Sequence, residues 1–364
     1  NDREMLHYFV EHAPLAIAWL EDLGIKVDDL TITGGMSKKR THRPSSMAPI
    51  GAFLVNNLLK LADERHIPIF IDSKVTSLLQ DKDKKITGVE VNKEHQVRAK
   101  AVLLATGGFG AAKDLIAKYR PDLRDYKTTN QAGATGDGFK LADKVGAQLE
   151  QLELVQVHPT VQQDTDHAYL IGEAVRGEGA ILVDRDGERF INELSTRKIV
   201  SNAITETPEH SAYLIFDQGV RDRVKAIEFY DSINLVVHGS TIEELAENIK
   251  VPAANLKKTL QSWNEAVKKN SDTEFGRTTG MASLDHAPYY AIHIAPAIHY
   301  TMGGIHIAPD TRVYDTNGNF IAGLYAAGEV SGGLHGNNRI GGNSIAETII
   351  FGREAGKTMA KLIK

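Results

Sequence analysis

The sequence contains no cysteine, and this absence removes several classes of site. Without thiols the chain holds no disulfide, no thiolate-bound iron–sulfur cluster and no haem attached through a Cys-x-x-Cys-His motif. No apolar run approaches the length of about 18 residues that a membrane-spanning helix needs. A net charge of −5 gives no overall basic character of the kind that binds nucleic acid. The 14 histidines form neither a His-x-x-x-His nor a His-Glu-x-x-His spacing, so we predict no metal site.

Glycine, in contrast, is concentrated in the stretch from His299 to Ser344. Three glycine clusters surround single charged residues there: Met302-Gly303-Gly304, Ala327-Gly328-Glu329 and Arg339-Ile340-Gly341-Gly342. Glycine lets the backbone approach a ligand closely and adopt positive φ angles. A helical pattern follows at once, so the free N–H groups of its first turn would point back at the glycines. We therefore predict a ligand site in this stretch, the alternative being a glycine-rich surface loop.

The hydrophobic pattern predicts an α/β protein. A helix is expected from 50 to 61, followed by short strands at 67–71, 74–79, 86–91 and 96–99. The apolar strand at 101–104 ends on Thr106-Gly107-Gly108. Open α/β sheets bind nucleotides where a strand runs into such a glycine turn, although a simple tight turn is the alternative. Farther on, Thr241 is expected to cap one helix, and a second helix is expected at 253–269.

Six motifs, in order, carry a resemblance to a known family. The chain resembles the flavoprotein subunits of the fumarate reductase and succinate dehydrogenase superfamily, in particular the soluble flavocytochrome c-type fumarate reductases. Urocanate reductase belongs to the same branch. The matching motifs cover essentially the whole chain: Thr41-His42-Arg43-Pro44, Ala105-Thr106-Gly107-Gly108-Phe109, Gly133-Ala134-Thr135-Gly136-Asp137-Gly138, His158-Pro159-Thr160, the run from Glu173-Ala174-Val175-Arg176-Gly177 to Asn192-Glu193-Leu194-Ser195-Thr196-Arg197, and the segment from His299 to Ser344.

The resemblance implies a Rossmann-like FAD-binding domain with an inserted α+β capping domain that closes over the flavin. Its boundaries would be 1–152 for the first part of the flavin domain, 153–298 for the capping (clamp) domain and 299–364 for the second part. Members of the family begin with a strand, a Gly-x-Gly-x-x-Gly turn and a helix. This chain opens instead on Asn1-Asp2-Arg3-Glu4, which is typical of a helix start. We therefore expect an N-terminally truncated flavin domain, with non-covalent FAD that is absent or partial in the isolated chain.

Three charged residues stand out for catalysis. By their spacing alone, Glu173, Arg176 and Arg197 would form a solvated salt-bridge face. The resemblance implies instead that Arg197 is the general acid and that Glu173 and Arg176 return its proton from solvent. Arginine is a poor acid, with a pKa above about 12. It can serve only because the proton moves to a carbanion-like centre that forms as hydride arrives.

The resemblance also implies the contacts to substrate and cofactor. His158, His299 and Arg339 match the positions that hold the substrate carboxylates, and the backbone at Gly342 assists. The planar guanidinium of Arg339 suits a carboxylate because it offers two parallel donors. By fixing a carboxylate, these residues would make the alkene accept hydride from N5 of reduced flavin. The flavin-contact positions are Val75, Ala105, Thr106, Gly107, Asp137, Tyr300, Glu329, Ser344 and Ile345.

Departures from the family pattern bear on the substrate. Gly172 stands where the flavocytochrome enzymes carry a threonine that touches the substrate carboxylate, and Tyr300 replaces a histidine that contacts flavin. His158 and Glu173 differ from the residues of urocanate reductase. We expect an FAD-dependent oxidoreductase of CH–CH bonds that converts fumarate to succinate in anaerobic respiration. The alternatives are reduction of another 2-enoate (an acrylate-type acid or urocanate), a flavin-linked oxidase or dehydrogenase, and a non-catalytic dicarboxylate-binding fragment.

The remaining expectations concern partners and location. The substrate would be a small dicarboxylate, and the electron donor would lie outside this chain, as a haem domain, an FMN domain or NADH acting through another domain. No nucleic acid and no membrane span are expected. We assign the chain to the cytoplasm. The periplasm is the alternative, because any signal peptide would have been lost with the missing N-terminal segment.

Overall fold

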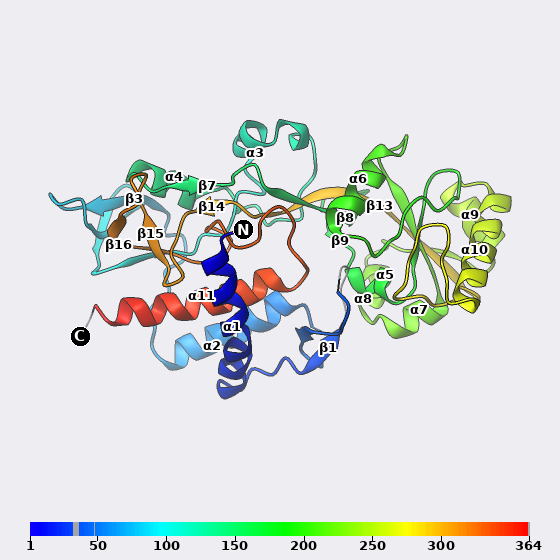
Figure 1. The fold of residues 1–364 in the computed structure, drawn as a ribbon, viewed down its shortest axis with the longest axis horizontal. Helices are drawn as coiled ribbons and strands as arrows, with labels where there is room; N and C mark the ends of the chain where they lie inside the picture. Colours follow the sequence, from blue (N-terminus) through cyan, green and yellow to red (C-terminus); the bar gives the residue numbers. More distant parts are fainter. Residues whose placement is uncertain (32–35, 47, 363–364) are drawn as a thin grey trace.

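Two lobes, each with its own apolar core, lie side by side along the long axis of the molecule (Figure 1). The structure is a computed structural model that describes residues 1–31, 36–46 and 48–362. Two long antiparallel strands, β8 (Val155–Gln162) and β13 (Tyr289–Thr301), run from one lobe into the other. The junction between the lobes is therefore built on paired strands.

The first lobe combines small sheets with long helices. The pair β6 (Val102–Leu104) and β16 (Phe320–Ala326) is parallel, and β15 (Arg312–Tyr314) extends it. The meander β3 (Val75–Gln80), β4 (Ile86–Val91) and β5 (His95–Arg98) is antiparallel. Two-stranded sheets are formed by β1 (Asp29–Thr31) with β2 (Thr41–Arg43) and by β7 (Leu149–Glu150) with β14 (Gly304–Ile305). The helices are α1 (Arg3–Asp22), α2 (Ile50–Glu64), α3 (Lys113–Tyr119), α4 (Asp137–Lys144) and α11 (Asn343–Ala360), with a 3₁₀ turn at Pro121–Leu123.

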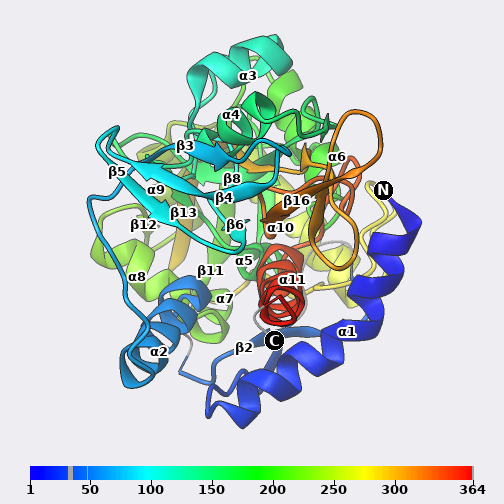
Figure 2. The same ribbon diagram turned by 90° about the vertical axis from the view of Figure 1, so that its left-hand side faces the viewer.

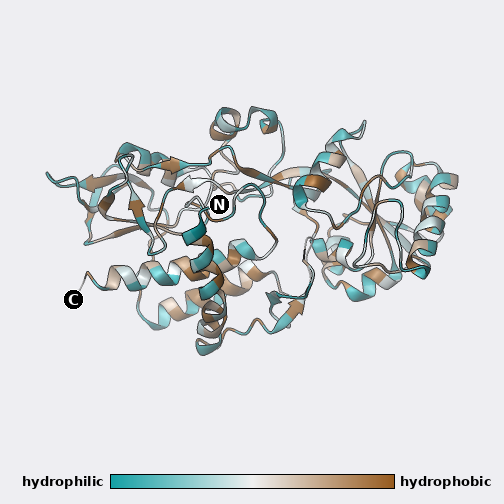
Figure 3. Cartoon of the chain, in the orientation of Figure 1, coloured by the Kyte–Doolittle hydropathy of each residue, from teal (hydrophilic) through white to brown (hydrophobic). Residues whose placement is uncertain are grey.

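The second lobe consists of one sheet with helices packed around it. Its strands follow the order β10 (Ile181–Val183), β11 (Ala212–Asp217), β13, β8 and β9 (Tyr169–Leu170), and β12 (Val237–Gly239) also pairs with β13. The helices are α5 (Glu173–Gly177), α6 (Arg197–Glu206), α7 (Gln218–Arg223), α8 (Ala226–Ser232), α9 (Ile242–Ile249) and α10 (Ala253–Lys268). β10 and β11 consist mainly of apolar residues, while the outer helices mix both colours, as amphipathic helices do (Figure 3).

Local sequence accounts for most of these elements. The carboxylate of Asp2 accepts hydrogen bonds from the N–H groups of Glu4 and Met5 and so caps α1, which packs against α11. Seen along the long axis, α11 lies between α1 and the strands of the first lobe (Figure 2). Thr241 accepts from the N–H of Glu244 at 3.1 Å and starts α9, as its sequence predicted. The α/β fold class is confirmed.

One predicted strand is wrong. The segment 67–71 forms no strand, and its apolar side chains are exposed, reaching 78% for Phe70 and 82% for Ile71. A strand needs a neighbour for its backbone N–H and C=O groups. In the described part of the chain no strand pairs with this segment, so its β-rich composition alone does not make it a strand.

Two further points concern the whole chain. Among the helices of the described residues, none has both the length and the apolar character needed to cross a lipid bilayer. The domain boundaries at 152/153 and 298/299 stay a prediction. β13 continues through the second of them without a break, although the two apolar cores lie on either side of the lobe junction.

Candidate active site

The two lobe-crossing strands place two histidines face to edge. His158 on β8 and His299 on β13 have ring centroids 5.3 Å apart. The strand register explains their meeting. Ile298 pairs with Val157 and Tyr300 with Gln156, so His299 is the extra residue of a β-bulge. A bulge redirects the side chain of the residue that it leaves unpaired.

Both histidines are neutral, and a backbone N–H group orients the ring of His158. Burial, reinforced by the charge of Arg197, lowers the pKa of His158 and of His299 well below the usual value. The N–H of Thr160 donates to Nδ1 of His158 at 3.3 Å, which places the proton of the neutral ring on Nε2. This Nε2 is buried and has no partner among the described residues. It is a hydrogen-bond donor that lacks an acceptor.

Arg197 and Glu173 form a close buried ion pair. Arg197 is the first residue of α6, and its Nε donates to Oε1 of Glu173, the first residue of α5, at 2.7 Å. Arg176, one turn along α5, lies 3.9 Å from the same carboxylate oxygen. Burial alone would raise the pKa of Glu173, but the charge and hydrogen bond of Arg197 lower it overall. Burial lowers the pKa of Arg176 to about 10. The three residues therefore form a chain of charged groups.

Arg339 is held from behind by an aromatic ring. It lies in the loop before α11, is buried, and its guanidinium carbon is 4.2 Å from the ring centre of Tyr300. The Tyr300 hydroxyl donates to Glu347, whose Oε2 also lies 2.8 Å from Nε2 of His335. Nε and Nη2 of Arg339 have no partner among the described residues. Because the ring supports the guanidinium without occupying its N–H groups, these donors stay available for a ligand.

Gln156 joins the two parts of this site and was missed by the sequence interpretation. Its Oε1 accepts from Nη1 of Arg197 at 2.9 Å, while its Nε2 donates to the backbone oxygen of Arg339 at 2.8 Å. The only local signal was its place two residues before His158, on the same face of the strand. The six predicted catalytic and carboxylate-binding side chains thus converge at the lobe junction: His158, Glu173, Arg176, Arg197, His299 and Arg339.

The charge of this cluster selects its ligand. Three buried guanidinium groups, on Arg176, Arg197 and Arg339, face the single carboxylate of Glu173, and the two histidines are neutral. Within these six residues an excess of two positive charges remains, because Glu329 and Glu347 act on Arg339 without forming an ion pair with it among the described residues. Buried charge is costly unless it is paired, so a dianion is the ligand that compensates this site.

The predicted flavin-contact residues lie in the first lobe around the end of the parallel pair β6 and β16. A Cβ at Gly108 would meet the carboxylate of Glu329, and one at Gly138 would meet the hydroxyl of Thr106. Lys74, next to Val75, lies 3.4 Å from Asp137. Gly328 lies beside Thr348 of α11, the helix that contains Ser344 and Ile345. These contacts bring the segments of the predicted flavin residues into one region.

The same region fits a flavin nucleotide. Ala105 and Thr106 are exposed and directly follow β6, which runs parallel to β16, at the carboxyl edge where open α/β sheets bind nucleotides. Helix α11 has 18 residues, and no side chain caps its N-terminus at Gly342. Burial raises the pKa of Glu329 to about 7, and the backbone and hydroxyl of Thr301 donate to its Oε1. The residues present therefore fit a dinucleotide cofactor.

The two glycines that the sequence analysis singled out, Gly172 and Gly342, lie at the starts of α5 and α11. The N–H of Gly172, just before α5, donates to the hydroxyl of Tyr230 at 3.0 Å, so a phenol lies beside the position without a side chain. Gly342 has φ +91 and is exposed, and a Cβ there would lie 3.3 Å from Thr41. It positions the start of α11 next to the 41–43 strand.

Comparison with known proteins gives concordant results. The FAD binding domain family matches residues 1–345. An NADH:fumarate oxidoreductase of Klebsiella pneumoniae is 45% identical over 99% of this chain, and a probable fumarate reductase of Shewanella frigidimarina is 41% identical over 99%. The chain spans 39% and 62% of the lengths of these two relatives. The open conformation of a flavocytochrome c3 fumarate reductase superposes with a TM-score of 0.81 at 41% identity, covering 100% of this chain and 64% of that one.

More distant relatives carry other substrate names. An NADH:acrylate oxidoreductase of Vibrio harveyi is 33% identical over 96% of this chain, which spans 36% of its length. A urocanate reductase of Eggerthella lenta is 34% identical over 90% of this chain, which spans 56% of its length. The matched segment is thus shared by proteins named for different 2-enoates.

Proposed function

This chain belongs to the FAD-binding domain family that includes the fumarate reductase flavoproteins, and on that premise we propose that it reduces fumarate to succinate. The observation that carries the proposal is the buried excess of two positive charges at the lobe junction, which matches the charge of a dicarboxylate. When bound, FAD supplies the hydride for this reaction. Val75, Ala105, Thr106, Gly107, Asp137, Tyr300, Glu329, Ser344 and Ile345 would hold the cofactor.

Substrate binding uses the donors that lack partners. Nε and Nη2 of Arg339 would take one carboxylate in the bidentate geometry that a guanidinium favours. Nε2 of His158, with His299 beside it, would donate to the other carboxylate. When both carboxylates are bound, the alkene between them is held in one position at the lobe junction. Positioning of this kind supplies a large part of a rate enhancement.

Proton delivery would come from Arg197. Hydride adds to one alkene carbon, the π bond breaks, and the electron pair left on the neighbouring carbon takes a proton from the guanidinium. Nε and Nη1 of Arg197 are engaged by Glu173 and Gln156, and Nη2 makes no hydrogen bond to a described residue. Arg176, 3.9 Å away, would give a proton to the ionised Glu173, which would pass it to the neutral guanidine of Arg197, and Arg176 would regain its proton from solvent.

A monocarboxylic 2-enoate is the second candidate, because relatives named for acrylate and urocanate share the same segment. A substrate with one carboxylate would leave either Arg339 or His158 without an acceptor. Unpaired buried donors carry a penalty of about 1–3 kcal/mol each. This penalty favours fumarate over an acrylate-type acid.

Arg197→Ala tests the assignment of the acid. In the FAD-loaded protein, with reduced viologen as the electron donor, we expect kcat for fumarate to fall by about 10² to 10⁴ because a positioned acid is lost. The Kd for fumarate, followed by the flavin absorbance, should change far less. The exposed neighbour Lys198→Ala is the matched control and should keep normal turnover. Near-normal kcat with a raised KM in Arg197→Ala would make Arg197 a binding residue, and His299 the next candidate acid.

Arg339→Ala separates binding from proton delivery. Because Arg339 would hold and orient the carboxylate, its loss should raise the Kd for fumarate and lower kcat together. The same absorbance titration and viologen assay measure both. If Arg339→Ala binds fumarate as tightly as the parent protein, the carboxylate lies elsewhere.

A further inference from the structure

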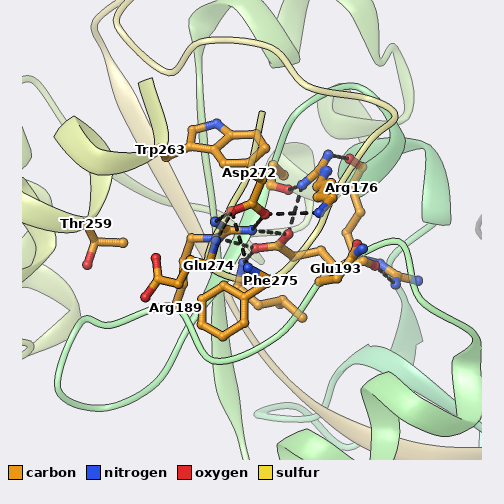
Figure 4. Close-up of polar contacts among 12 residues, drawn as sticks. Arg176, Arg189, Glu193, Thr259, Trp263, Asp272, Glu274 and Phe275 are labelled. Carbon is orange, nitrogen blue, oxygen red and sulfur yellow. Dashed lines mark hydrogen bonds and ion pairs between the residues drawn. The ribbon is translucent and has the colours of Figure 1, made fainter. Parts of the chain in front are cut away.

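A cluster of four buried charged residues lies in the second lobe, outside the site described above. This charge cluster consists of Arg189, Glu193, Asp272 and Arg277, whose side chains are at most 4% exposed. Figure 4 shows its members Arg189, Glu193 and Asp272 gathered beside Trp263, with Arg176 close by. Buried ion pairs are often no more stabilising than apolar residues of the same volume. The charge cluster is therefore more informative for the neighbouring groups that it holds in place than for the stability of the lobe.

Arg277 is the best-connected member of the charge cluster. All five of its N–H groups have acceptors: Nε donates to Thr279 O, Nη1 to Ala180 O and to Oε2 of Glu193, and Nη2 to Arg176 O and Gly280 O. Its guanidinium carbon lies 4.9 Å from the ring centre of Trp263. Because all N–H groups of this planar guanidinium are hydrogen-bonded, it fixes the orientation of every group that it contacts.

Two of these contacts reach the elements that contain the proposed proton path. The backbone oxygen of Arg176, near the end of α5, accepts from Arg277 at 2.5 Å. Glu193 accepts from Arg277 at 3.1 Å and lies four residues before Arg197. The backbone oxygen of Glu193 also accepts from Nη1 of Arg176 at 2.6 Å. Arg277 thus fixes α5 and the segment leading into α6 relative to each other.

Arg176 itself has few other restraints. Its Nε and Nη2 are buried without a hydrogen-bond partner among the described residues, and its nearest carboxylate oxygen is 3.9 Å away on Glu173. The side chain is held by one strong hydrogen bond, to the backbone of Glu193. The position of Arg176 relative to Glu173 therefore depends on how the backbones of α5 and of Glu193 are held.

We propose that Arg277 is a positioning residue for proton transfer, which sets the distances along Arg176, Glu173 and Arg197 through the backbone of α5 and the side chain of Glu193. The proposal rests on the proposed function, because it assumes that these three residues return a proton to the substrate. Arg277 does not approach the carboxylate-binding groups. Its loss should therefore slow proton delivery and leave fumarate binding intact.

Arg277→Lys in the FAD-loaded protein is the first test. An ammonium offers three donors in place of five and cannot reproduce the fork. We expect kcat with reduced viologen to fall about 100-fold, as for a displacement of reacting groups by about 1 Å. The solvent deuterium isotope effect on kcat should rise, because proton transfer becomes rate-limiting. The Kd for fumarate should stay at the parent value.

Arg221→Lys is the matched control. Arg221 lies in the same lobe and likewise pairs with carboxylates, at 2.8 Å from both Glu228 and Asp231, over an aromatic ring, that of Tyr290. Among the described residues it forms no ion pair or hydrogen bond with α5 or with the segment before α6. Its replacement should leave kcat, the isotope effect and the fumarate Kd unchanged.

Gly280→Ala is a second variant that keeps every charge. A Cβ at Gly280 would collide with the backbone oxygen of Gly177 at the end of α5, so the loop with Arg277 must shift. The same fall in kcat and rise in isotope effect, at constant fumarate Kd, would support the proposal. A lower melting temperature with normal kcat in both variants would show that the cluster only stabilises the lobe. Parallel loss of kcat and fumarate binding in both would also overturn the proposal. Absence of fumarate reduction in the parent protein would instead contradict the proposed function.

Discussion

At the scale of single residues, the central feature is how Arg339 is kept charged and available. A buried guanidinium usually pairs with a carboxylate, which would compete with a substrate for the same N–H groups. Here the carboxylate of Glu347 is engaged by the Tyr300 hydroxyl and lies against His335, and the Tyr300 ring contacts Arg339. Burial lowers the pKa of Arg339 to about 10, so it remains charged at neutral pH. Tyr300 therefore supports the arginine that we propose binds the substrate carboxylate.

Replacement of Tyr300 tests this support. Tyr300→Leu removes the ring, and we expect the KM for fumarate to rise about tenfold, which corresponds to a cation–π contact of about 1.4 kcal/mol. Tyr300→Phe keeps the ring and serves as the control, so its KM should stay near the parent value. Steady-state kinetics with reduced viologen measures both. If the two variants raise KM equally, the hydroxyl bonded to Glu347, and not the ring, holds Arg339.

At the scale of elements, β8 joins Arg197, the proposed acid, to the loop that contains Arg339. Gln156 on this strand bonds to Arg197 at the start of α6 and to the backbone of Arg339. Gln156→Leu would leave both groups unpaired in a buried place, at a cost of about 1–3 kcal/mol. We expect kcat to fall at least tenfold because Arg197 is no longer oriented. The control for the effect on folding is Gln162→Leu, at the end of the same strand. Gln162 is also buried, and among the described residues its side chain bonds only to Asp164. Equal kcat in the two variants would show that Gln156 has no such orienting effect.

The elements also show what the sequence could predict. The helices at 50–61 and 253–269, the strands at 86–91 and 101–104 and the Thr241 cap follow from local periodicity and capping, and the structure has them. The strand at 67–71 was wrong because pairing depends on a neighbouring strand that local sequence does not reveal. Gln156 and Arg277 were missed for a similar reason. Their partners lie 41 to 183 residues away for Gln156 and up to 101 for Arg277. The roles assigned to Arg197, Glu173 and His158 stay predictions.

At the scale of the whole molecule, charge is distributed unevenly. The chain has a net charge of −5, yet three arginines are buried close together at its lobe junction, and Glu173 is the carboxylate that pairs with two of them. Burial among low-dielectric surroundings strengthens the field of these arginines relative to exposed charges. The two lobes contribute to this field together: Arg176 and Arg197 lie in the second lobe, and Arg339 precedes the last helix of the first. A ligand that compensates the charge should therefore also stabilise the contact between the lobes.

Thermal unfolding with small acids tests this consequence in the FAD-loaded protein. A ligand at 100 times its Kd raises the free energy of unfolding by about 2.7 kcal/mol. We expect succinate and malonate, which carry two carboxylates, to raise the melting temperature at concentrations where propionate and acrylate have no effect. In Arg339→Ala the difference between dianions and monoanions should disappear, because one carboxylate loses its partner. Added salt should weaken the effect of dianions only modestly, since buried charges are screened less than exposed ones. If acrylate stabilises the parent protein as strongly as succinate does, the site recognises a single carboxylate, and an acrylate-type acid replaces fumarate as the substrate.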